Sequence, residues 1–329
     1  MTEIKLVCAP MEGMTNRIYR RAHHELFGGV DFYYAPFINI TDHFDRTDRS
    51  AKDILPENNV GVPIVPQVLT NRAEDLIHAA QVLKDMGYAE VDLNLGCPSG
   101  TVVSKGRGSG LLADPDALDR LLDAAYAKSP LPISLKTRIG MKDVSETERL
   151  FSIYAKYPVS PLIVHPRLRS EQYKGIAHAD IFDVLAKEMP FPVCYNGDLF
   201  TAKAARDFLN ARPWVAGAMF GRGLIADPAL ARELRGGKRL EKAELRAFYD
   251  RLVQDYLEEM PGEKTMLFHI KELSLYMVSL FPDAQKHAKR IRKANTLRDF
   301  NAAIDRLFDE KELDPKGAFD METTFPSHG

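Results

Sequence analysis

The sequence predicts a (β/α)8 barrel followed by a small all-helical domain. Short apolar runs alternate with helical segments up to about residue 235, and eight such strand–helix units are typical of this barrel. Beyond a glycine-containing break at Arg235–Lys238 the strand-like runs stop and only helical periods continue. A doubly wound sheet shows the same alternation and remains an alternative, because strand order cannot be read from a sequence.

The expected strands are short, uninterrupted and rich in Val, Ile and Leu, which is typical of parallel strands buried on both faces. They are Ile4–Ala9, Val30–Ala35, Pro63–Val68, Glu90–Leu95, Leu131–Thr137, Pro161–His165, Phe191–Tyr195 and Trp214–Phe220. The clearest helices between them are Asn71–Met86, Asp114–Lys128, Ser145–Tyr157 and Thr201–Asn210, and the candidate N-caps are Thr15, Asn71, Asp114 and Thr201. The charged segment Thr41–Leu55 has the least regular helical pattern.

We expect four parts along the chain: a barrel over 1–235, a linker over 236–240, a helical domain over 241–313 and a loose tail over 314–329. Helical periods in the second half cover Lys242–Met260, Lys264–Leu280 and Ala284–Leu307. The tail is polar, contains Pro and Gly and has no period.

Composition excludes several classes of protein. The chain of 329 residues has no run of 18 apolar residues, so no membrane span is expected. Met1–Lys5 leads into only a short apolar stretch, unlike a signal peptide. The three cysteines, Cys8, Cys97 and Cys194, are odd in number and far apart, which argues against a disulfide framework or a clustered metal site. These features favour a cytoplasmic protein without a metal.

Positive charge is concentrated in one stretch of the helical domain. Between Lys264 and Arg298 eight basic residues stand against two acids, so this stretch carries +6 in a chain of net charge −2. The eight are Lys264, Lys271, Lys286, Lys289, Arg290, Arg292, Lys293 and Arg298. A solvated helix face is the alternative, but an asymmetry of this size favours a polyanionic partner.

Polar, reactive or glycine-rich residues follow almost every expected strand, at the end where such barrels form their active sites. These strand ends are Pro10–Gly13, Gln67, Asn94–Pro98, Lys136–Arg138, His165–Arg167, Asn196–Asp198 and Gly221–Gly223. The runs before them are apolar, so we interpret the convergence of polar residues as one site.

Two features of these strand ends predict an anionic ligand. The glycine-rich ends of the last two strands let backbone N–H groups approach a phosphate, and Arg222 adds a charged fork of donors. Two ordinary glycine turns with a surface arginine are the alternative. Lys136 ends an apolar strand, where its ammonium group would stabilise negative charge on a ligand. A structural lysine that reaches out to solvent is the alternative there.

Cys97 differs from the other two cysteines. Cys8 and Cys194 lie within apolar strands, where cysteine behaves as a small hydrophobic residue. Cys97 lies in a Gly-Cys-Pro turn just past a strand, and a reactive thiol needs such exposure. The basic, glycine-rich stretch Lys105–Gly110 is suited to closing over a substrate.

Several of these segments match one enzyme family in order and type. The segment Asp92–Pro98 is followed by Val102, Gly106, Gly108, Gly110-Leu111-Leu112 and Asp114-Pro115, and Cys8–Thr15 lies at the first strand. Lys136–Gly140, His165 with Arg167, Tyr173–Gly175, Asn196–Asp198 and Gly221–Gly223 follow in order. Over about residues 4–300 the chain resembles the tRNA-dihydrouridine synthases, and the segment around Cys97 is similar to the catalytic segment of that family.

The resemblance implies an FMN-binding barrel and a helical domain that grips tRNA. It implies that NADPH or NADH reduces FMN, that hydride passes to C6 of uridine and that Cys97 protonates C5, as a thiol with a pKa of about 8.5 can at neutral pH. The implied cofactor residues are Pro10, Met11, Gln67, Asn94, Lys136, His165, Asn196, Gly197, Asp198, Gly221 and Arg222. The RNA side would be Arg138, Arg167 and Tyr173, together with Lys271, Lys286, Lys289, Arg290, Arg292 and Lys293. We expect a monomer.

The chain departs from the family pattern near the expected substrate mouth. Ala35-Pro36-Phe37 stands where members often carry Thr-Glu, and His165-Pro166-Arg167-Leu168 replaces His-Gly-Arg-Thr. These changes leave open which uridine is reduced. Two other functions also remain open: an FMN barrel of the dihydroorotate type that reduces a free small molecule, and a non-catalytic RNA-binding protein on the same scaffold.

Overall fold

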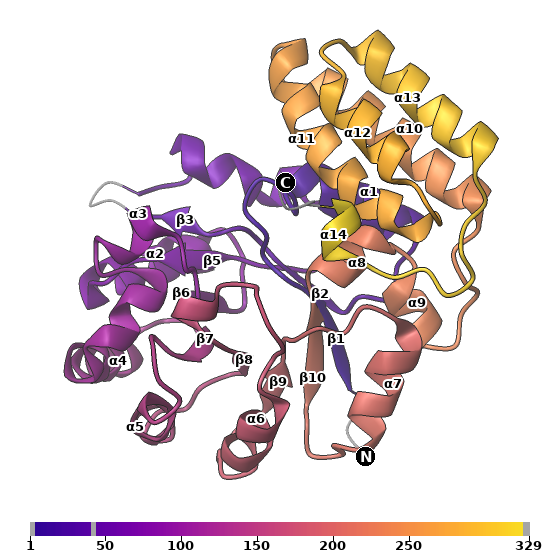
Figure 1. The fold of residues 1–329 in the computed structure, drawn as a ribbon. Coiled ribbons are helices and arrows are strands. Elements are labelled where there is room, and N and C mark those ends of the chain that lie inside the picture. Colours follow the sequence, from indigo (N-terminus) through magenta and orange to yellow (C-terminus); the bar gives the residue numbers. More distant parts are fainter. Residues whose placement is uncertain (1–3, 41–43, 325–329) are drawn as a thin grey trace. The chain divides into compact units, whose positions relative to one another are not determined.

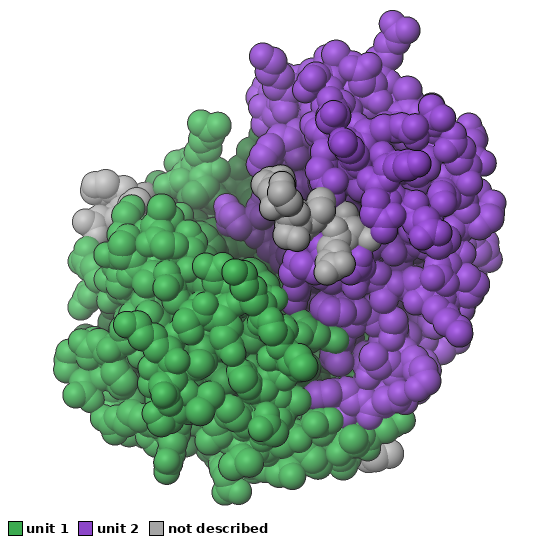
Figure 2. All heavy atoms as spheres, viewed as in Figure 1, with its two compact units in different colours: residues 1–10, 31–198, 209–219 green, residues 11–30, 199–208, 220–329 purple. Residues whose placement is uncertain are grey.

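The computed structural model describes residues 4–40 and 44–324. The chain divides into two compact units (Figure 2). Unit 1 comprises residues 1–10, 31–198 and 209–219, and unit 2 comprises residues 11–30, 199–208 and 220–329. No helix among the described residues has the length and apolar character needed to cross a membrane.

Ten strands form one sheet in the order β3-β5-β6-β7-β8-β9-β10-β1-β2-β4 (Figure 1). Their bounds are β1 Lys5–Cys8, β2 Phe32–Tyr34, β3 Ile38–Asn39, β4 Ile64–Val65, β5 Gln67–Leu69, β6 Val91–Leu95, β7 Ile133–Gly140, β8 Leu162–Leu168, β9 Val193–Tyr195 and β10 Gly217–Phe220. Each expected strand overlaps one or two of these.

The sheet closes into a barrel at a proline. β4 and β5 are halves of one strand interrupted at Pro66, which has no N–H group to donate to a ladder. β2 pairs with β4 and β3 pairs with β5, in the registers Tyr33↔Ile64 and Ile38↔Val68. The two ends of the sheet therefore meet. Eight strands remain when β2 and β3, which are separated only by residues 35–37, are counted as one strand and β4 and β5 as another. This closure confirms the predicted barrel against the doubly wound alternative.

Helices follow most of the strands, and further helices make up the rest of unit 2. Unit 1 contains α2 Ala73–Asp85, α3 Gly100–Val103, α4 Pro115–Lys128, α5 Glu146–Tyr154 and α6 Ala179–Ala186. Unit 2 contains α1 Arg17–Leu26, α8 Arg222–Ala226, α9 Leu230–Leu234, α10 Lys242–Glu259, α11 Glu263–Met277, α12 Gln285–Lys293, α13 Leu297–Glu310 and α14 Met321–Thr324. Helix α7, Ala202–Asn210, begins in unit 2 and ends in unit 1.

Two of the four expected N-caps are confirmed. Asp114 accepts a hydrogen bond from Ala117 N (2.9 Å), and the Thr201 hydroxyl accepts one from Ala204 N (3.0 Å). Thr15 does not cap α1, because its hydroxyl accepts from Met11 N (2.8 Å) and Asn16 takes the capping position.

Asn71 does not cap α2 either. Its amide donates to Lys105 O (3.0 Å), and the helix begins after Arg72.

The charged segment after the second strand does not form an α-helix where it is described. Residues 41–43 lie outside the described residues, and the rest contains only the 3-10 turns Arg49–Asp53 and Pro56–Asn58. Asp45 and Asp48 accept hydrogen bonds from the backbone two residues on, at 2.6 and 2.7 Å. Such local bonds compete with helix formation.

The end of the chain is packed as far as Thr324, although its composition predicted a loose tail. Phe319 is only 7% exposed, and its ring stacks on that of Tyr276 with centroids 5.4 Å apart. Asp314 N donates to Leu280 O (2.9 Å). One buried aromatic side chain thus anchors a segment that has no periodic pattern.

Candidate active site

A chain of buried hydrogen bonds crosses three neighbouring strands inside the barrel. Gln67, Asp92 and Ser134 are register partners on β5, β6 and β7, and each is fully buried. Gln67 Nε2 and Ser134 Oγ donate to the two Asp92 carboxyl oxygens, at 2.6 and 2.9 Å. Asn94 Nδ2 donates to Gln67 Oε1 at 2.7 Å. Asp92 therefore fixes the orientation of the Gln67 amide, and Gln67 in turn fixes the orientation of the Asn94 amide.

Asn94 in turn holds the loop that carries Cys97. Its Oδ1 accepts hydrogen bonds from Gly96 N (3.1 Å) and Cys97 N (2.9 Å), which turns the chain at the end of β6. The Ser109 hydroxyl donates to Cys97 O at 2.8 Å. The main chain of Cys97 is thus held on both sides, while its thiol is half-buried and forms no disulfide.

Gly108 is required beside Cys97. Its φ of +56° lies in the left-handed region, which L side chains rarely adopt. A Cβ built there would lie 3.1 Å from Cys97 Cβ and 3.0 Å from Cys97 O. Any larger residue at this position would displace Cys97.

Lys136 places a cation beside this polar chain. It is the register partner of Asn94 on β7. Burial and the neighbouring Arg138 charge lower the pKa of Lys136 to about 8, although Asp92 opposes the shift. Burial raises the pKa of Asp92 to about 8, against the effect of its hydrogen bonds from Gln67 and Ser134. The positive charge of this buried lysine is only partly offset by negative charge nearby, and an anionic ligand would stabilise it.

Arg138 and Arg167, expected on the RNA side, are each 1% exposed and hold loops of their own chain. Arg138 donates to the carbonyl oxygens of Gly96 (2.8 Å), Leu168 (3.1 Å) and Gln172 (2.8 Å). Its guanidinium therefore ties the loop that follows β6 to the loop that follows β8.

Arg167 is engaged in the same way. It donates to Asp198 Oδ1 (3.0 Å) and Oδ2 (2.5 Å) and to Gly175 O (2.8 Å). Its Nη1 lies 3.2 Å from His165 Nε2. Because a guanidinium can only donate, His165 Nε2 accepts, and the ring proton is assigned to Nδ1.

Tyr173 is the exposed member of this group, at 46%. Its ring stacks on His165 with centroids 5.9 Å apart, and the Arg138 guanidinium carbon lies 5.4 Å from the ring centre. Gln172 just before it has a φ of +54°, unusual for a residue other than glycine. A strained loop residue thus precedes an aromatic side chain that is accessible for stacking.

The residues after β9 form a tight turn. Asn196 Nδ2 donates to Met219 O at 2.8 Å. A Cβ at Gly197 would fall 2.1 Å from the Tyr195 hydroxyl oxygen, so only glycine fits. Asp198 follows with its carboxylate bound by Arg167.

In unit 1 the structure thus brings Cys97, Asn94, Gln67 and Lys136 into one hydrogen-bonded or register-paired group. Pro10 follows β1 and is half-buried.

The remaining expected cofactor residues lie in unit 2. Met11 is half-buried, and its carbonyl oxygen accepts hydrogen bonds from Met14 N and Thr15 N. Gly221 precedes α8, which begins with Arg222. The Arg222 guanidinium carbon lies 5.3 Å from the centre of each of two phenylalanine rings, Phe200 and Phe319.

The basic stretch divides into exposed and structural residues. Lys286, Lys289, Arg290 and Lys293 on α12 are exposed, while His287, Ala288 and Ile291 form the buried face of the helix. Lys271 instead donates to Ala294 O (2.7 Å), just past the end of α12, and Arg292 donates to Thr324 O (2.9 Å).

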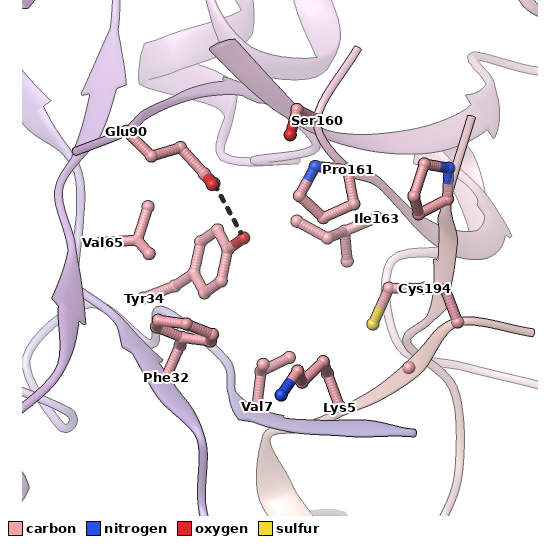
Figure 3. A pocket seen from close by; sticks show the side chains of 13 residues that line it. Lys5, Val7, Phe32, Tyr34, Val65, Glu90, Ser160, Pro161, Ile163 and Cys194 are labelled. Atoms are coloured by element: carbon pink, nitrogen blue, oxygen red, sulfur yellow. Dashed lines mark hydrogen bonds between the residues drawn. The ribbon is translucent and has the colours of Figure 1, made fainter. Parts of the chain in front are cut away.

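A cavity of about 200 Å³ lies elsewhere in unit 1, among the residues at the amino ends of the strands (Figure 3). Val7, Val65 and Ile163 give it apolar walls. The Tyr34 hydroxyl donates to Glu90 at 3.2 Å across one side. Cys194 also lines it, and burial raises the pKa of this thiol to about 12, so it remains protonated. None of the expected site residues lines this cavity.

Sequence reasoning missed Asp92 and Ser134 as members of the site. Asp92 lies within the segment that resembles the catalytic segment of the family, and an acid inside an otherwise apolar strand could have indicated it. Ser134 gives no such signal, because a serine in a strand is ordinary. Only its register opposite Asp92 reveals its role.

Comparison with known proteins identifies relatives over most of the chain. A family model described as "Dihydrouridine synthase (Dus)" matches residues 7–314. The "tRNA-dihydrouridine(16) synthase" of Cupriavidus necator is 31% identical over 239 residues, which are 70% of this chain and 74% of the relative. The "Probable tRNA-dihydrouridine synthase 1" of Synechocystis is 26% identical over 321 residues, 94% of this chain and 88% of the relative.

A solved structure, morphinone reductase in complex with tetrahydroNAD, shares the barrel fold. Its TM-score is 0.50 at 13% identity, and the match covers 72% of this chain and 88% of that structure.

Proposed function

Because the chain belongs to the dihydrouridine synthase family, we propose that it reduces uridine in tRNA to 5,6-dihydrouridine, with Cys97 as the proton donor. One observation supports this assignment above the others. The Cys97 main chain is fixed through Asn94 and Ser109, while the thiol is half-buried and outside any disulfide. A general acid needs this combination of fixed position and access.

The cofactor class is a flavin, and we propose FMN. The donor set fits the polar edge of a flavin, since the Gln67 and Asn94 amides both donate and accept and Lys136 supplies a positive charge. When bound and reduced, FMN supplies the hydride that adds to C6 of the uracil ring. The Cys97 thiol then gives its proton to C5, so that one hydride and one proton saturate the double bond.

Residues after the later strands would hold the ribityl and phosphate groups of FMN. We propose Asn196, Gly197 and Asp198 for the ribityl chain, because Arg167 neutralises the Asp198 carboxylate and leaves it suited to accept from hydroxyl groups. Gly221 and Arg222 are proposed for the phosphate.

Three further residues complete the proposed cofactor contacts. They are Pro10, Met11 and His165. Lys136 would stabilise negative charge on the reduced ring. His165, neutral and held by Arg167, would present an Nδ1–H donor.

The structure supports fewer RNA-binding residues than the sequence implied. Arg138 and Arg167 are committed to carbonyl and carboxylate groups of their own chain, so we propose that they hold loops. Tyr173 retains an exposed ring that a base could stack on. The target uridine must leave its stack, which a loop nucleotide does most easily. NADPH or NADH as reductant, a monomeric state and a cytoplasmic location remain part of the proposal.

The two rival functions are not favoured. Family membership over residues 7–314 argues against a reductase of a free metabolite, and an accessible Cys97 beside Lys136 argues against a non-catalytic scaffold.

The proposed function is tested with purified protein and an unmodified tRNA transcript. The protein should release FMN on denaturation and, with NADPH, should form dihydrouridine at defined positions that sequencing of the product maps. A protein that neither contains nor binds FMN, or a tRNA that gains no dihydrouridine with either nicotinamide cofactor, would contradict the proposal.

The proposed tRNA surface is tested by its response to salt. We expect Ala substitution of the exposed α12 lysines, Lys286, Lys289 and Lys293, to lower the slope of log affinity against log salt by roughly one per contacting residue. The matched control replaces three exposed lysines of other helices, Lys84, Lys128 and Lys203. Equal slopes in the two variants would mean that α12 is only a solvated face.

A further inference from the structure

Specific contacts hold residues 314–324 within unit 2. We call residues 314–324 the C-terminal strap. Asp314 N donates to Leu280 O, and Gly317 N to Asp314 O, at 2.9 and 2.8 Å. At its far end Arg292 donates to Thr324 O at 2.9 Å. The family match ends at residue 314, where the strap begins.

The strap inserts one aromatic side chain, Phe319, into a cluster of rings. Phe319 is 7% exposed. Its ring centre lies 5.1 Å from that of Phe200 and 5.4 Å from that of Tyr276, with which it stacks at 21°. Phe200, Tyr276 and Phe319 thus come from three distant parts of the sequence and pack together within unit 2.

This cluster holds the guanidinium of Arg222. The guanidinium carbon is 5.3 Å from the ring centre of Phe200 and equally 5.3 Å from that of Phe319. Both distances are within the range of cation–π attraction. Two ring contacts restrict where the guanidinium can lie.

We propose that Phe319 is a positioning residue for the flavin phosphate, acting through Arg222. The inference rests on the proposed function, in which Arg222 binds that phosphate. A long side chain loses rotational freedom when it binds, and a side chain held in place beforehand loses less. The C-terminal strap thus contributes to cofactor retention, although it touches neither the reacting uridine nor Cys97 in the proposed mechanism.

The test compares FMN with riboflavin, which lacks the phosphate, in binding to the apo form of the full chain. Phe319→Leu keeps an apolar side chain but removes the ring. We expect it to weaken FMN affinity by about two- to fivefold and to leave riboflavin affinity unchanged. Arg222→Ala should weaken FMN affinity at least about tenfold, also without affecting riboflavin. Phe319→Tyr keeps the ring and should bind both ligands as the wild type does.

Two further variants separate positioning from general packing. Phe281→Leu is a matched control, because Phe281 is also buried in unit 2 and packs against Phe308, yet it does not contact Arg222 in the ring cluster. It should lower the melting temperature without changing FMN affinity. If Phe319→Leu fails to fold, Phe200→Leu removes the other ring and should give the same loss for FMN alone.

The outcomes distinguish the inference from the proposed function. Equal losses for FMN and riboflavin, or no loss in either ring variant while Arg222→Ala is impaired, would overturn the role of Phe319 alone. Unchanged FMN affinity in Arg222→Ala would overturn the phosphate assignment and with it the inference. A wild-type protein that binds no flavin would overturn the proposed function itself.

Discussion

Buried polar side chains form a hydrogen-bonded network across β5, β6 and β7, whereas residues at the amino ends of the strands surround a largely apolar cavity. The network contains Asp92, Gln67 and Asn94, and Lys136 is the register partner of Asn94. Burial shifts the pKa values of Asp92 and Lys136 to about 8. The cavity of about 200 Å³ contains one hydrogen-bonded acid, Glu90, among apolar walls. A buried charge is expensive unless something compensates for it.

The difference shows that the apolar cavity and the proposed site are lined by different residues of this protein. A large apolar pocket with a few polar groups is the usual first choice for a binding site. In this protein the apolar cavity lies at the amino ends of the strands, and burial keeps the thiol of Cys194, which lines it, protonated. The perturbed titratable groups Asp92 and Lys136 lie with the network instead, and the held and accessible thiol of Cys97 lies in the loop after β6.

The largest expected effect distinguishes Cys97, in the loop after β6, from Cys194, which lines the cavity. Cys97→Ala should fold and retain flavin but lower the rate of dihydrouridine formation by about 100-fold or more, because it removes the general acid. Cys194→Ala, at the cavity, should leave the rate unchanged. Dihydrouridine formed per minute in a tRNA transcript and the flavin released on denaturation are the measurements. If the Cys97→Ala protein formed dihydrouridine at the normal rate, the proton donor would have to be another group.

A second prediction compares a buried acid of the network, Asp92, with the acid at the cavity, Glu90, through the pH dependence of stability. Because the folded pKa of Asp92 lies above its unfolded value, its contribution to stability is present below about pH 4 and is lost as pH rises towards about 8. Asp92→Asn should therefore reduce the fall in melting temperature between about pH 5 and pH 8. The full effect of such a shift is on the order of a few kcal/mol.

Glu90→Gln is the matched variant at the cavity. Burial also raises the pKa of Glu90, so its removal should change the pH dependence in the same direction but by less. A pH profile of Asp92→Asn that coincides with that of the wild type would mean that Asp92 keeps an ordinary pKa.

The sequence predicted the barrel because uninterrupted apolar runs are a local pattern that marks the strands. The proposed site residues come from the same kind of pattern, since polar residues follow the apolar runs. The break of one strand at Pro66 was within reach of the same reasoning, since proline cannot donate to a ladder.

Other features depend on contacts between distant residues. Arg138 and Arg167 look like RNA-binding residues in the sequence, and only the structure reveals that loop carbonyls and Asp198 take up their donors. Phe319 belongs to a polar, aperiodic tail and is buried only because Phe200 and Tyr276 converge on it. No local pattern carries this information.

The smallest expected effect concerns side-chain packing, and it compares a position that lines the cavity with a position that is fully packed. Val65 lines the cavity, so Val65→Ile places one more methylene group in empty space and should raise the free energy of unfolding by about 0.8 kcal/mol. Val164 on β8 is fully buried and does not line the cavity, so Val164→Ile should overpack its surroundings and lower that free energy by about 1–3 kcal/mol. Urea denaturation of both variants beside the wild type measures the two changes. Dihydrouridine formation should be normal in Val65→Ile, because none of the proposed site residues lines the cavity. A loss of activity without a loss of stability in Val65→Ile would instead show that the cavity communicates with the proposed site, and the separation between the cavity and the network would have to be abandoned.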